Sequence, residues 1–319
     1  MAPKPLGYNA TLAERIDLTD ALTLYRVMPD ERPAPGWFVP GQYCVLGMNH
    51  DDKPELGGVR RSMSIASAPE DSGPIEFYIR YVAKPESENP LTHRLWTLKT
   101  GDRMYMRPVA AGVFTVKDTV GEDDQRFRIC VAAGTGSAPF VSMVRSELRR
   151  NPQADLSKYV ILHGASYPSD LGHRDELLGL AETHGLKYFG TVSRPAPGDG
   201  WSGDTGRVEG FFAGERLAEL ERRLGLAPGG FLPTQAVIFI CGLQGTIGTT
   251  ITNLCQRGFV PDHKRMREAL GAPTEAPATL FYEQYDTEPV IDIKDPAVVE
   301  PLKAQLVAAL GRLGAGTAS

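Results

Sequence analysis

The stretch Phe127-Arg-Ile-Cys-Val-Ala-Ala-Gly-Thr-Gly-Ser-Ala-Pro-Phe140 decides the fold. It begins with an apolar run, continues through a glycine turn and places Pro139 near the start of an amphipathic segment that extends to Arg149. This order predicts a buried strand, a tight turn and a helix.

Strands and helices alternate after this stretch. The predicted strands are Phe127–Ala133, Tyr159–His163, Tyr188–Val192 and Ala236–Ile240, and the predicted helices are Ala138–Arg149, Leu171–Thr183, Val208–Leu224 and Gly248–Arg257. Such alternation predicts a parallel sheet with helices on both faces.

The sequence before this part has a different pattern, in which Gly and Pro separate short apolar runs. The predicted strands are Thr11–Asp17, Leu22–Met28, Gln42–Gly47, Ser62–Ala66, Ile75–Val82, Arg103–Arg107 and Val113–Val116, with one short helix at Leu91–Leu98. Many short strands of this kind predict an antiparallel β-barrel.

The acidic segment 117–125 has no apolar periodicity and predicts a hairpin tip or a linker. We therefore expect a two-domain fold, with an antiparallel β-barrel at 1–125 and an α/β parallel-sheet domain at 126–279. Residues 280–319 are expected to form an aromatic tail plus a C-terminal extension, whose helix runs from Pro296 to about Leu313.

Composition excludes several classes of function. The 319 residues are 42% hydrophobic and 23% charged, with no apolar run long enough for a membrane span, and the net charge of -5 disfavours nucleic-acid binding. The first residues lack the apolar core of a signal peptide, so a cytoplasmic protein is expected. The cysteines at 44, 130, 241 and 255 have no paired spacing, so we expect no zinc site or iron–sulfur cluster, and redox chemistry would need an organic cofactor.

Gly134, Thr135 and Gly136 form the turn between the predicted strand and helix. Glycines allow the backbone to approach a phosphate, and the free N–H groups and dipole at the helix start attract an anion. The turn therefore predicts a phosphate site, although tight strand–helix turns without a ligand are also common in α/β folds.

Ser193 and Arg194 follow another predicted strand at its carboxyl end, where open α/β sheets bind ligands. A hydroxyl beside a guanidinium suits a phosphate monoester, and Arg207 can join them from the start of the next predicted helix. The alternative is an ordinary exposed Ser-Arg pair.

Two further motifs are candidates for a binding site. Cys241-Gly242-Leu243 again joins a strand to a glycine turn, which places a small thiol at the same sheet edge, but a buried structural cysteine is the alternative, and the sequence does not place a base such as His163 beside it. Arg61-Ser-Met63-Ser64 offers a cation and a hydroxyl that suit a diphosphate and a ring edge, or simply an exposed strand.

Taken together, Arg-Ser-Met-Ser-Ile-Ala-Ser at 61–67, Gly-Thr-Gly-Ser-Ala-Pro-Phe at 134–140, Val-Ser-Arg at 192–194 and Cys-Gly-Leu-Gln-Gly at 241–245 resemble the ferredoxin–NADP reductase superfamily. The resemblance covers residues 8 to 286 and is closest to the bacterial ferredoxin or flavodoxin reductases. It implies FAD in the barrel, NADP(H) on the α/β domain, hydride transfer between them, and single-electron exchange with a ferredoxin or flavodoxin. A monomer or weak dimer is expected.

The resemblance also implies roles for residues of the barrel. Arg61 would hold the flavin diphosphate and Ser64 would approach flavin N5, while Met63 replaces the aromatic residue that normally packs on the flavin. The other flavin-binding positions implied in this way are Tyr78, Ile79, Arg80, Tyr81, Thr92, Ala111, Gly112 and Val113.

In the second domain the resemblance implies a nicotinamide site and a 2′-phosphate site. The nicotinamide end would lie near Thr135 and Cys241, with Gly134, Gly136, Gly242 and Leu243 around it, and the 2′-phosphate near Ser193, Arg194 and Arg207. The aromatic tail would touch the flavin through Tyr282 and Tyr285. Glu283 is either a proton donor, which with Ser64 and Cys241 completes the expected catalytic set, or an exposed carboxylate without function.

Other functions remain open at this point. The reductase component of an oxygenase or P450 system and an NAD(P)H flavin reductase share both domains, and a non-catalytic dinucleotide sensor is an alternative of another class. The basic residues Arg60, Lys84, Lys99 and Arg103 near the expected flavin edge predict docking of an acidic ferredoxin.

Overall fold

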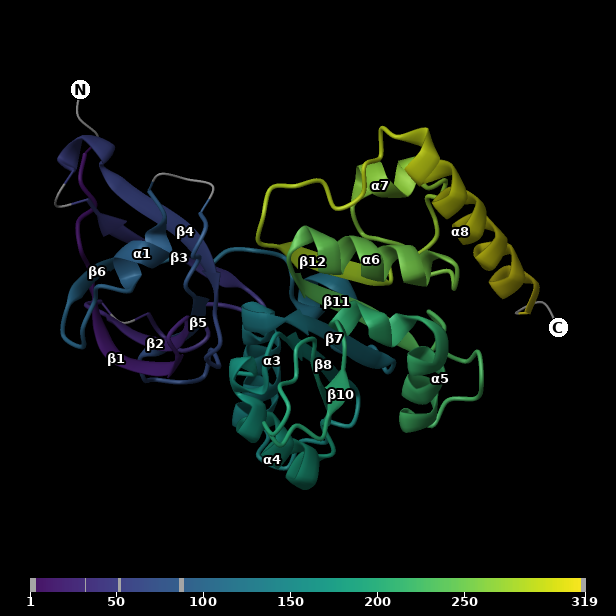
Figure 1. Cartoon of the computed structure of the whole chain (residues 1–319), viewed down its shortest axis with the longest axis horizontal. Coiled ribbons are helices and arrows are strands. Elements are labelled where there is room, and N and C mark those ends of the chain that lie inside the picture. The colour runs from purple at the N-terminus through teal and green to yellow at the C-terminus, as the bar shows by residue number, and fades with distance from the viewer. Residues whose placement is uncertain (1–3, 32, 51–52, 86–88, 317–319) are drawn as a thin grey trace. The chain divides into compact units, whose positions relative to one another are not determined.

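The computed structural model describes residues 4–31, 33–50, 53–85 and 89–316 (Figure 1). Its internal contacts divide the chain into two units. Unit 1 contains Met1–Asp118 and Ser137–Ala154, and unit 2 contains Thr119–Gly136 and Asp155–Ser319. The chain therefore returns to unit 1 for one helix after it has first entered unit 2.

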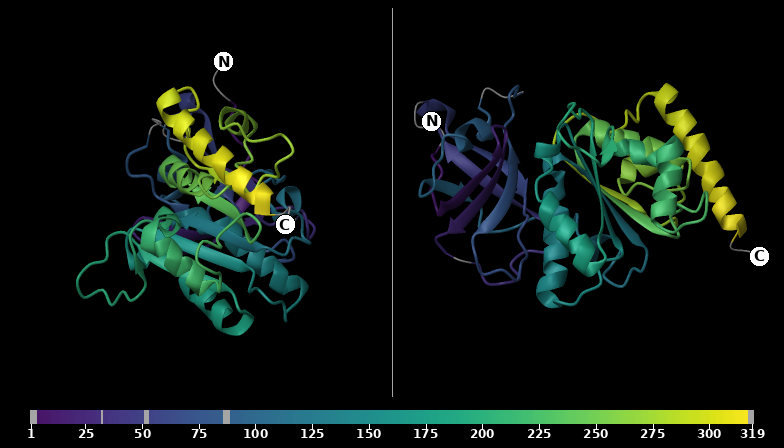
Figure 2. Two further views of the ribbon diagram at one scale, coloured as in Figure 1. Left: turned by 90° about the vertical axis from the view of Figure 1, so that its right-hand side faces the viewer. Right: turned by 60° about the horizontal axis from the view of Figure 1, so that its bottom comes forward.

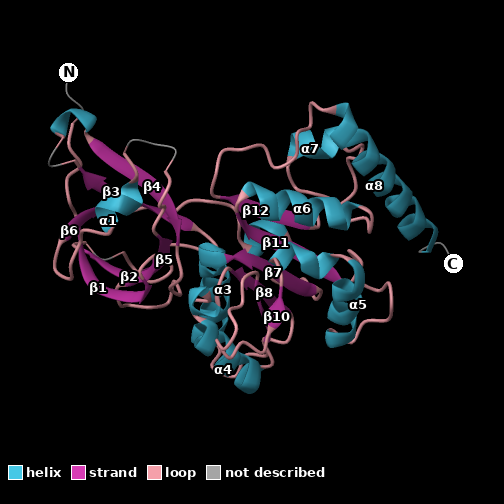
Figure 3. Ribbon diagram, viewed as in Figure 1, coloured by secondary structure: helices cyan, strands magenta, loops and turns pink. Residues whose placement is uncertain are grey.

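Unit 1 is built around an antiparallel sheet (Figure 3). Its elements are β1 (Ala10–Thr19), β2 (Leu22–Pro29), β3 (Tyr43–Asn49), the 3-10 turn η1 (Pro54–Leu56), β4 (Gly58–Ser64), β5 (Ile75–Arg80), α1 (Leu91–Leu95), β6 (Arg103–Met106), α2 (Val116–Thr119) and α3 (Ala138–Arg150). The strand order is β4-β3-β6-β1-β2-β5, and a bridge between Ile65 and Phe77 joins the two edges. This closure confirms the predicted barrel.

The barrel is filled by one cluster of apolar side chains. Tyr25, Leu46 and Phe77 are fully buried in it, together with Leu91 and Leu95 from the predicted short helix. Burial of such side chains contributes about 1.5–3 kcal/mol each to the free energy of folding. This core therefore stabilises the barrel strands, including β4 with its Arg61–Ser64 motif.

The strand predicted at Val113–Val116 is wrong. Val113 is largely exposed, and Thr115 accepts a hydrogen bond at its hydroxyl oxygen from the backbone N–H of Asp118 at 2.9 Å. A threonine that accepts from the amide three residues later starts a helix, and α2 begins at the next residue.

Unit 2 is a parallel sheet covered by helices (Figure 2). Its elements are β7 (Phe127–Ala133), η2 (Gly134–Ser137), β8 (Tyr159–Ala165), η3 (Pro168–Asp170), α4 (Arg174–His184), β9 (Lys187–Val192), β10 (Asp204–Thr205), η4 (Val208–Phe212), α5 (Gly214–Arg223), β11 (Ala236–Gly242), α6 (Gln244–Cys255), α7 (Lys264–Ala269), β12 (Leu280–Gln284) and α8 (Pro296–Gly316). The parallel sheet confirms the predicted α/β fold, and its strand order β10-β9-β8-β7-β11-β12 shows that the sheet is doubly wound.

The single helix predicted over Val208–Leu224 is also wrong, because it divides into η4 and α5. Ala213 between them is extended, with φ -138° and ψ 148°, and Gly214 has a φ of +52°. Glycine adopts this left-handed conformation without steric cost, so the chain changes direction here and α5 begins anew.

The C-terminal extension packs on unit 2 as the helix α8. Leu302 and Leu306 are buried in the same apolar cluster as Ile247 and Ile251 of α6, and Figure 1 shows α8 beyond α6 in the colour of the chain end. Within the described part of the chain, no helix combines the length and the apolar character that a membrane span requires.

Candidate functional site

The sheet of unit 2 reverses its winding between β7 and β11. From β7 the chain proceeds outward through β8 and β9, whereas β11 and β12 lie on the other side of β7. Open α/β sheets bind ligands at the carboxyl ends of the strands at such a reversal. The turn after β7 and the Cys241-Gly242-Leu243 turn after β11 both lie there.

The two turns are in close contact. A Cβ atom on Gly136 would lie 2.1 Å from the carbonyl oxygen of Cys241, and Gly134 has a φ of +56°. A Cβ on Gly242 would lie 3.0 Å from the Cβ of Ala133 on the neighbouring strand. Gly136 is therefore required by the approach of β11 to β7, whether or not a ligand binds.

His163 supports the glycine turn from the end of β8. The imidazole is fully buried, its Nε2 is 3.0 Å from the carbonyl oxygen of Gly134, and the Tyr188 hydroxyl is 3.3 Å from Nδ1. Burial lowers the pKa of His163 to about 4, with a smaller contribution from the charge of His173. A neutral ring that donates from Nε2 and accepts at Nδ1 satisfies both contacts, so His163 is a structural support and not a base beside Cys241.

Ser137 follows the turn at the N-cap of α3. Its hydroxyl is buried, and it has no hydrogen-bond partner among the described residues. An orphaned buried hydroxyl at a helix start costs free energy unless a further group satisfies it. This fits a phosphate-bearing ligand at the turn.

Cys241 lies beside two residues of the aromatic tail. Its buried thiol donates to the Tyr285 hydroxyl at 3.0 Å and lies 3.8 Å from a carboxylate oxygen of Glu283. The parallel register pairs Cys241 of β11 with Glu283 of β12, so both side chains lie on the same face of the sheet. The structure therefore brings together these three predicted residues.

Tyr282 lies on the other face. It is paired with Ile240 and packs against the apolar cluster of unit 2. Burial, and then the charge of Asp262, raises the pKa of its hydroxyl. Of the two predicted tail tyrosines, Tyr285 alone is beside Cys241, whereas Leu243 is exposed on its own turn.

The Ser193-Arg194 segment follows the carboxyl end of β9, and Arg207 follows the carboxyl end of the adjacent strand β10. Thr191 and Val192 of β9 pair in parallel with Asp204 and Thr205 of β10, so the two segments continue side by side. All three side chains are exposed: the Ser193 hydroxyl is 3.4 Å from the carbonyl oxygen of Ala165, and Arg207 is 3.7 Å from the carboxylate of Glu209. A hydroxyl and two guanidinium groups at a sheet edge suit a phosphate monoester.

In the barrel, the residues of the Arg61–Ser64 motif lie on two different faces of β4. The register pairs Leu46 with Arg61 and Cys44 with Met63, which places Arg61 and Met63 on the side of the barrel core. Ser64 faces the opposite side and is buried. Arg61 is exposed and donates to the carbonyl of Arg60 at 2.8 Å. An exposed guanidinium on β4 fits an anionic ligand.

The weaker barrel candidates lie in varied surroundings. The side chain of Ile79 lies in the barrel core and can offer a ligand only its backbone, while Tyr78 is buried on the other face of β5 and Arg80 is exposed. The ring of Tyr81 stacks on His93 at 4.6 Å, and the hydroxyl of Thr92 accepts from the amide of Val82 at 3.4 Å.

Around Gly112 the backbone approaches β3 closely. Ala111 and Tyr43 exchange two backbone hydrogen bonds of 2.9 and 3.0 Å, and Gly112, with a φ of +107°, leaves room for the ring of Tyr43. Val113 is 72% exposed.

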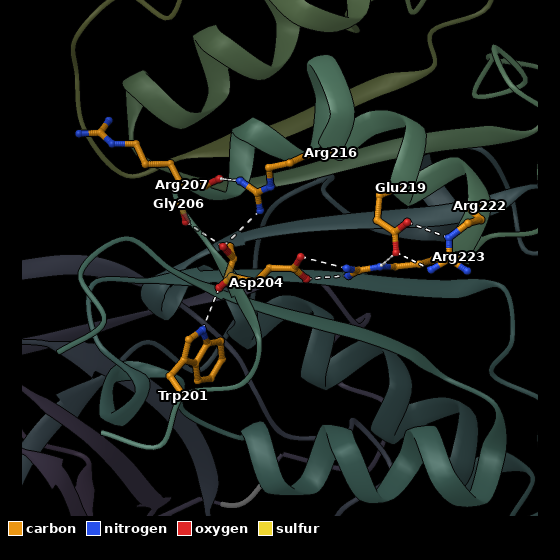
Figure 4. Close-up of polar contacts among 9 residues, drawn as sticks. Trp201, Asp204, Gly206, Arg207, Arg216, Glu219, Arg222 and Arg223 are labelled. Carbon is orange, nitrogen blue, oxygen red and sulfur yellow. Dashed lines mark hydrogen bonds and ion pairs between the residues drawn. The ribbon is translucent and has the colours of Figure 1, made fainter. Parts of the chain in front are cut away.

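Sequence reasoning missed a polar cluster behind Arg207 (Figure 4). Arg216 of α5 donates to the carbonyl of Arg207, and Arg223 of the same helix binds the carboxylate of Asp204. An arginine on an amphipathic helix gives no sequence signal for such a role. The glycines at 206 and 210, which make room for Arg216, were the available sign.

Comparisons with known proteins agree with this architecture. Residues 130–250 match the family model described as the oxidoreductase NAD-binding domain. The chain is 36% identical over 190 residues to ferredoxin–NADP reductase B of Sorangium cellulosum, which is 59% of this chain and 68% of that protein. It is 28% identical over 280 residues to the phenol hydroxylase P5 protein of Acinetobacter pittii, which is 86% of this chain and 70% of that protein.

Among solved structures, a ferredoxin NADP+ reductase from Neisseria gonorrhoeae with bound FAD and NADP has the same fold. The TM-score is 0.64 at 20% identity, over 87% of this chain and 96% of the other. A closed barrel, a doubly wound sheet and two glycine turns at its reversal define an oxidoreductase of the two-domain, nucleotide-binding class. The identity with the Sorangium reductase and the share of that protein which is covered establish the family as well. The chain belongs to the ferredoxin–NADP reductase family.

Proposed function

We propose that this protein is a ferredoxin–NADP+ reductase that binds FAD in the barrel and NADP(H) on the α/β domain. It exchanges single electrons with a ferredoxin or flavodoxin. The observation that carries the proposal is the meeting of the Gly134–Gly136 turn, Cys241 and Tyr285 at the reversal of the sheet. It supplies a phosphate cradle and a ring site on one edge of unit 2.

The residues of unit 2 bind and orient the dinucleotide. The backbone N–H groups of the glycine turn, and the Ser137 hydroxyl next to it in the chain, donate hydrogen bonds to its phosphates, and Ser193, Arg194 and Arg207 hold the 2′-phosphate. Tyr285 covers the thiol of Cys241 and moves aside when the nicotinamide enters. When bound, the two cofactors supply the hydride and electron chemistry.

The residues of unit 1 hold the second cofactor. Arg61 pairs with its diphosphate, and Ser64 offers a hydroxyl near the reacting edge of its ring. Met63 replaces a flat aromatic contact with a flexible thioether, which interacts with ring edges more weakly than a stacked aromatic does.

The test is anaerobic mixing of the purified protein with NADPH and, separately, with NADH, with the visible flavin absorbance followed by stopped flow. We expect fast loss of absorbance with NADPH and slow loss with NADH. Equal rates would remove Ser193, Arg194 and Arg207 as a 2′-phosphate site. A protein that binds no flavin, or that binds both nucleotides without turnover, would contradict the proposal.

A second candidate is the reductase component of an oxygenase. The match to the phenol hydroxylase P5 protein extends over more of this chain than the match to the Sorangium reductase, at lower identity. The two functions differ in the acceptor. Under NADPH the reductase proposal predicts rapid reduction of ferredoxin or flavodoxin, whereas electron delivery only to an oxygenase component would favour the second candidate.

A further inference from the structure

Arg216 lies in the first turn of α5, behind the loop that carries Arg207. Its Nη1 donates to the carbonyl oxygen of Arg207 at 2.8 Å, and its Nη2 donates to the Thr191 hydroxyl at 3.2 Å. The guanidinium carbon is 4.1 Å from the ring centroid of Phe211. Hydrogen bonds at one edge and an aromatic ring at the face fix the guanidinium in one orientation.

Two glycines make room for this guanidinium. A Cβ on Gly210 would lie 2.7 Å from Nη1 of Arg216, and a Cβ on Gly206 would lie 3.2 Å from it. Gly206 also has a φ of +103°, which disfavours any residue with a side chain. The backbone around Arg207 therefore accommodates the side chain of Arg216 in particular.

Arg216 has no ion pair among the described residues. The nearby carboxylate of Asp204 accepts two hydrogen bonds from Arg223, at 2.6 and 3.0 Å, and that of Glu209 is paired with Arg207. Partial burial lowers the pKa of Arg216, but a guanidinium stays charged. A partly buried cation without its own counter-ion costs free energy, which makes it a candidate for a functional charge.

The contacts of Arg216 connect the two segments of the proposed 2′-phosphate site. Thr191, two residues before Ser193, donates from its hydroxyl to the carbonyl of Gly206 at 2.8 Å and accepts from Arg216. Arg216 in turn holds the carbonyl of Arg207 itself. Figure 4 shows Arg216 with its hydrogen bond to Arg207, and Gly206 beside them.

The C-terminal end of α5, the helix that carries Arg216, is anchored to β10. Arg223 binds Asp204 of β10 and also Glu219, and the indole N–H of Trp201 donates to the carbonyl of Asp204 at 2.9 Å. With α5 held in this way, Arg216 cannot follow a displaced loop. The loop is held at the position that Arg216 sets.

We propose that Arg216 is a positioning residue for selectivity between nucleotides with and without a 2′-phosphate. It sets the separation of Ser193 and Arg194 from Arg207, and it adds behind them a positive charge that has no direct ion pair among the described residues. This inference rests on the proposed function, because it assumes that these three residues receive the phosphate monoester.

The test uses equilibrium binding by calorimetry, with adenosine 2′,5′-bisphosphate and adenosine 5′-monophosphate as probes. R216Q is expected to weaken binding of the bisphosphate by about tenfold and to leave the monophosphate affinity unchanged. R216K, which keeps the charge but not the planar fork, should fall between R216Q and the native protein. R222Q is the matched control, since Arg222 is exposed on the same helix and, among the described residues, binds Glu219 and no part of the loop.

Steady-state kinetics with the flavin-loaded protein give an independent measurement. R216Q should raise KM for NADPH with kcat unchanged, and KM for NADH should stay the same. An unchanged bisphosphate affinity in R216Q, or an equal loss for both probes, would overturn the inference.

R207Q separates this inference from the proposed function. If the native protein prefers the bisphosphate and R207Q abolishes that preference while R216Q retains it, the 2′-phosphate site stands and the role of Arg216 is wrong. If the native protein shows no preference for the bisphosphate, both are wrong.

Discussion

His163 shows how one buried side chain makes the candidate site sensitive to pH. In the unfolded chain its pKa has the ordinary value of 6.5, whereas in the folded protein burial lowers it to about 4. Between these values the unfolded chain binds a proton that the folded chain does not. Acid therefore favours unfolding.

We expect the stabilisation that depends on a neutral His163 to be fully present above pH 6.5. The free energy of unfolding should then decrease as the pH falls from 6.5 toward 4. The contribution of His163 is up to about 3 kcal/mol. Denaturant titrations at a series of pH values measure it. H163Q can still donate to the Gly134 carbonyl but does not titrate, so its unfolding free energy should lose this part of the pH dependence; an identical pH profile would contradict the assignment.

The individual site residues were accessible from the sequence to different degrees. Roles for Cys241, Glu283 and Tyr285 in one site were expected only from the family resemblance, and the register of β11 and β12 is what places Cys241 beside Glu283. The unequal positions of Tyr282 and Tyr285 depend on the register of β12, which was not predicted as a strand. Arg216 was missed because an arginine on an amphipathic helix gives no signal of its own, and the only sign was the pair of glycines at 206 and 210 that make room for it.

At the scale of elements, the packing of β7 against β11 depends on Gly136. G136A would place a Cβ 2.1 Å from a backbone carbonyl, which cannot move without displacing β11. We expect destabilisation by about 2–3 kcal/mol, measured by chemical denaturation. G179A is the matched control. Gly179 lies inside α4, and a Cβ there would have no neighbour within 4 Å apart from the backbone of the helix itself, so the change should stabilise the protein by about 0.5–1 kcal/mol.

The helix α3 is fixed to unit 1 through a buried carboxylate. Glu76 of β5 is 3% exposed and accepts from Arg145 of α3 at 2.8 Å and from Arg26 of β2 at 2.9 Å. The Ser142 hydroxyl also donates to the carbonyl of Ser67 at 2.7 Å. These bonds connect the helix after the glycine turn to the segment that follows Ser64.

E76Q leaves two arginines without their shared charge. We expect a loss of about 3 kcal/mol of unfolding free energy, at the lower limit for a broken buried pair because both arginines are partly exposed. E14Q is the control, since Glu14 binds the same Arg26 at the surface and should cost below about 1 kcal/mol. Equal effects of the two variants in thermal denaturation would show that burial of Glu76 is unimportant.

Element prediction succeeded where periodicity was strong and failed where single residues changed the backbone. The strand at Phe127–Ala133 was located to the residue, because its apolar run ends at a glycine turn. At Val113–Val116 a threonine cap overrode strand-forming side chains, and at Ala213-Gly214 an extended residue and a left-handed glycine interrupted a helical pattern. Tertiary context decides such positions.

At the scale of the whole molecule, the net charge of -5 does not favour an acidic partner, so docking of a ferredoxin depends on where the positive charges lie. Arg60, Lys84 and Lys99 are exposed in unit 1. Arg103, in contrast, is paired with Asp30, whose pKa it lowers through a side-chain hydrogen bond. The predicted acceptor surface therefore consists of the first three residues, and Arg103 contributes little net charge to it.

We expect K84E and K99E each to lower kcat/KM for ferredoxin severalfold at low ionic strength, because each reverses a charge that attracts the acidic acceptor. The effect should fade as salt shortens the Debye length below about 10 Å. K303E on α8, which belongs to unit 2, makes the same change in net charge outside the predicted acceptor surface and should leave the rate unaltered. Flavin reduction by NADPH should be equal in all three variants. If K303E lowers the ferredoxin rate as much as K84E and K99E do, net charge and not a local surface controls the encounter.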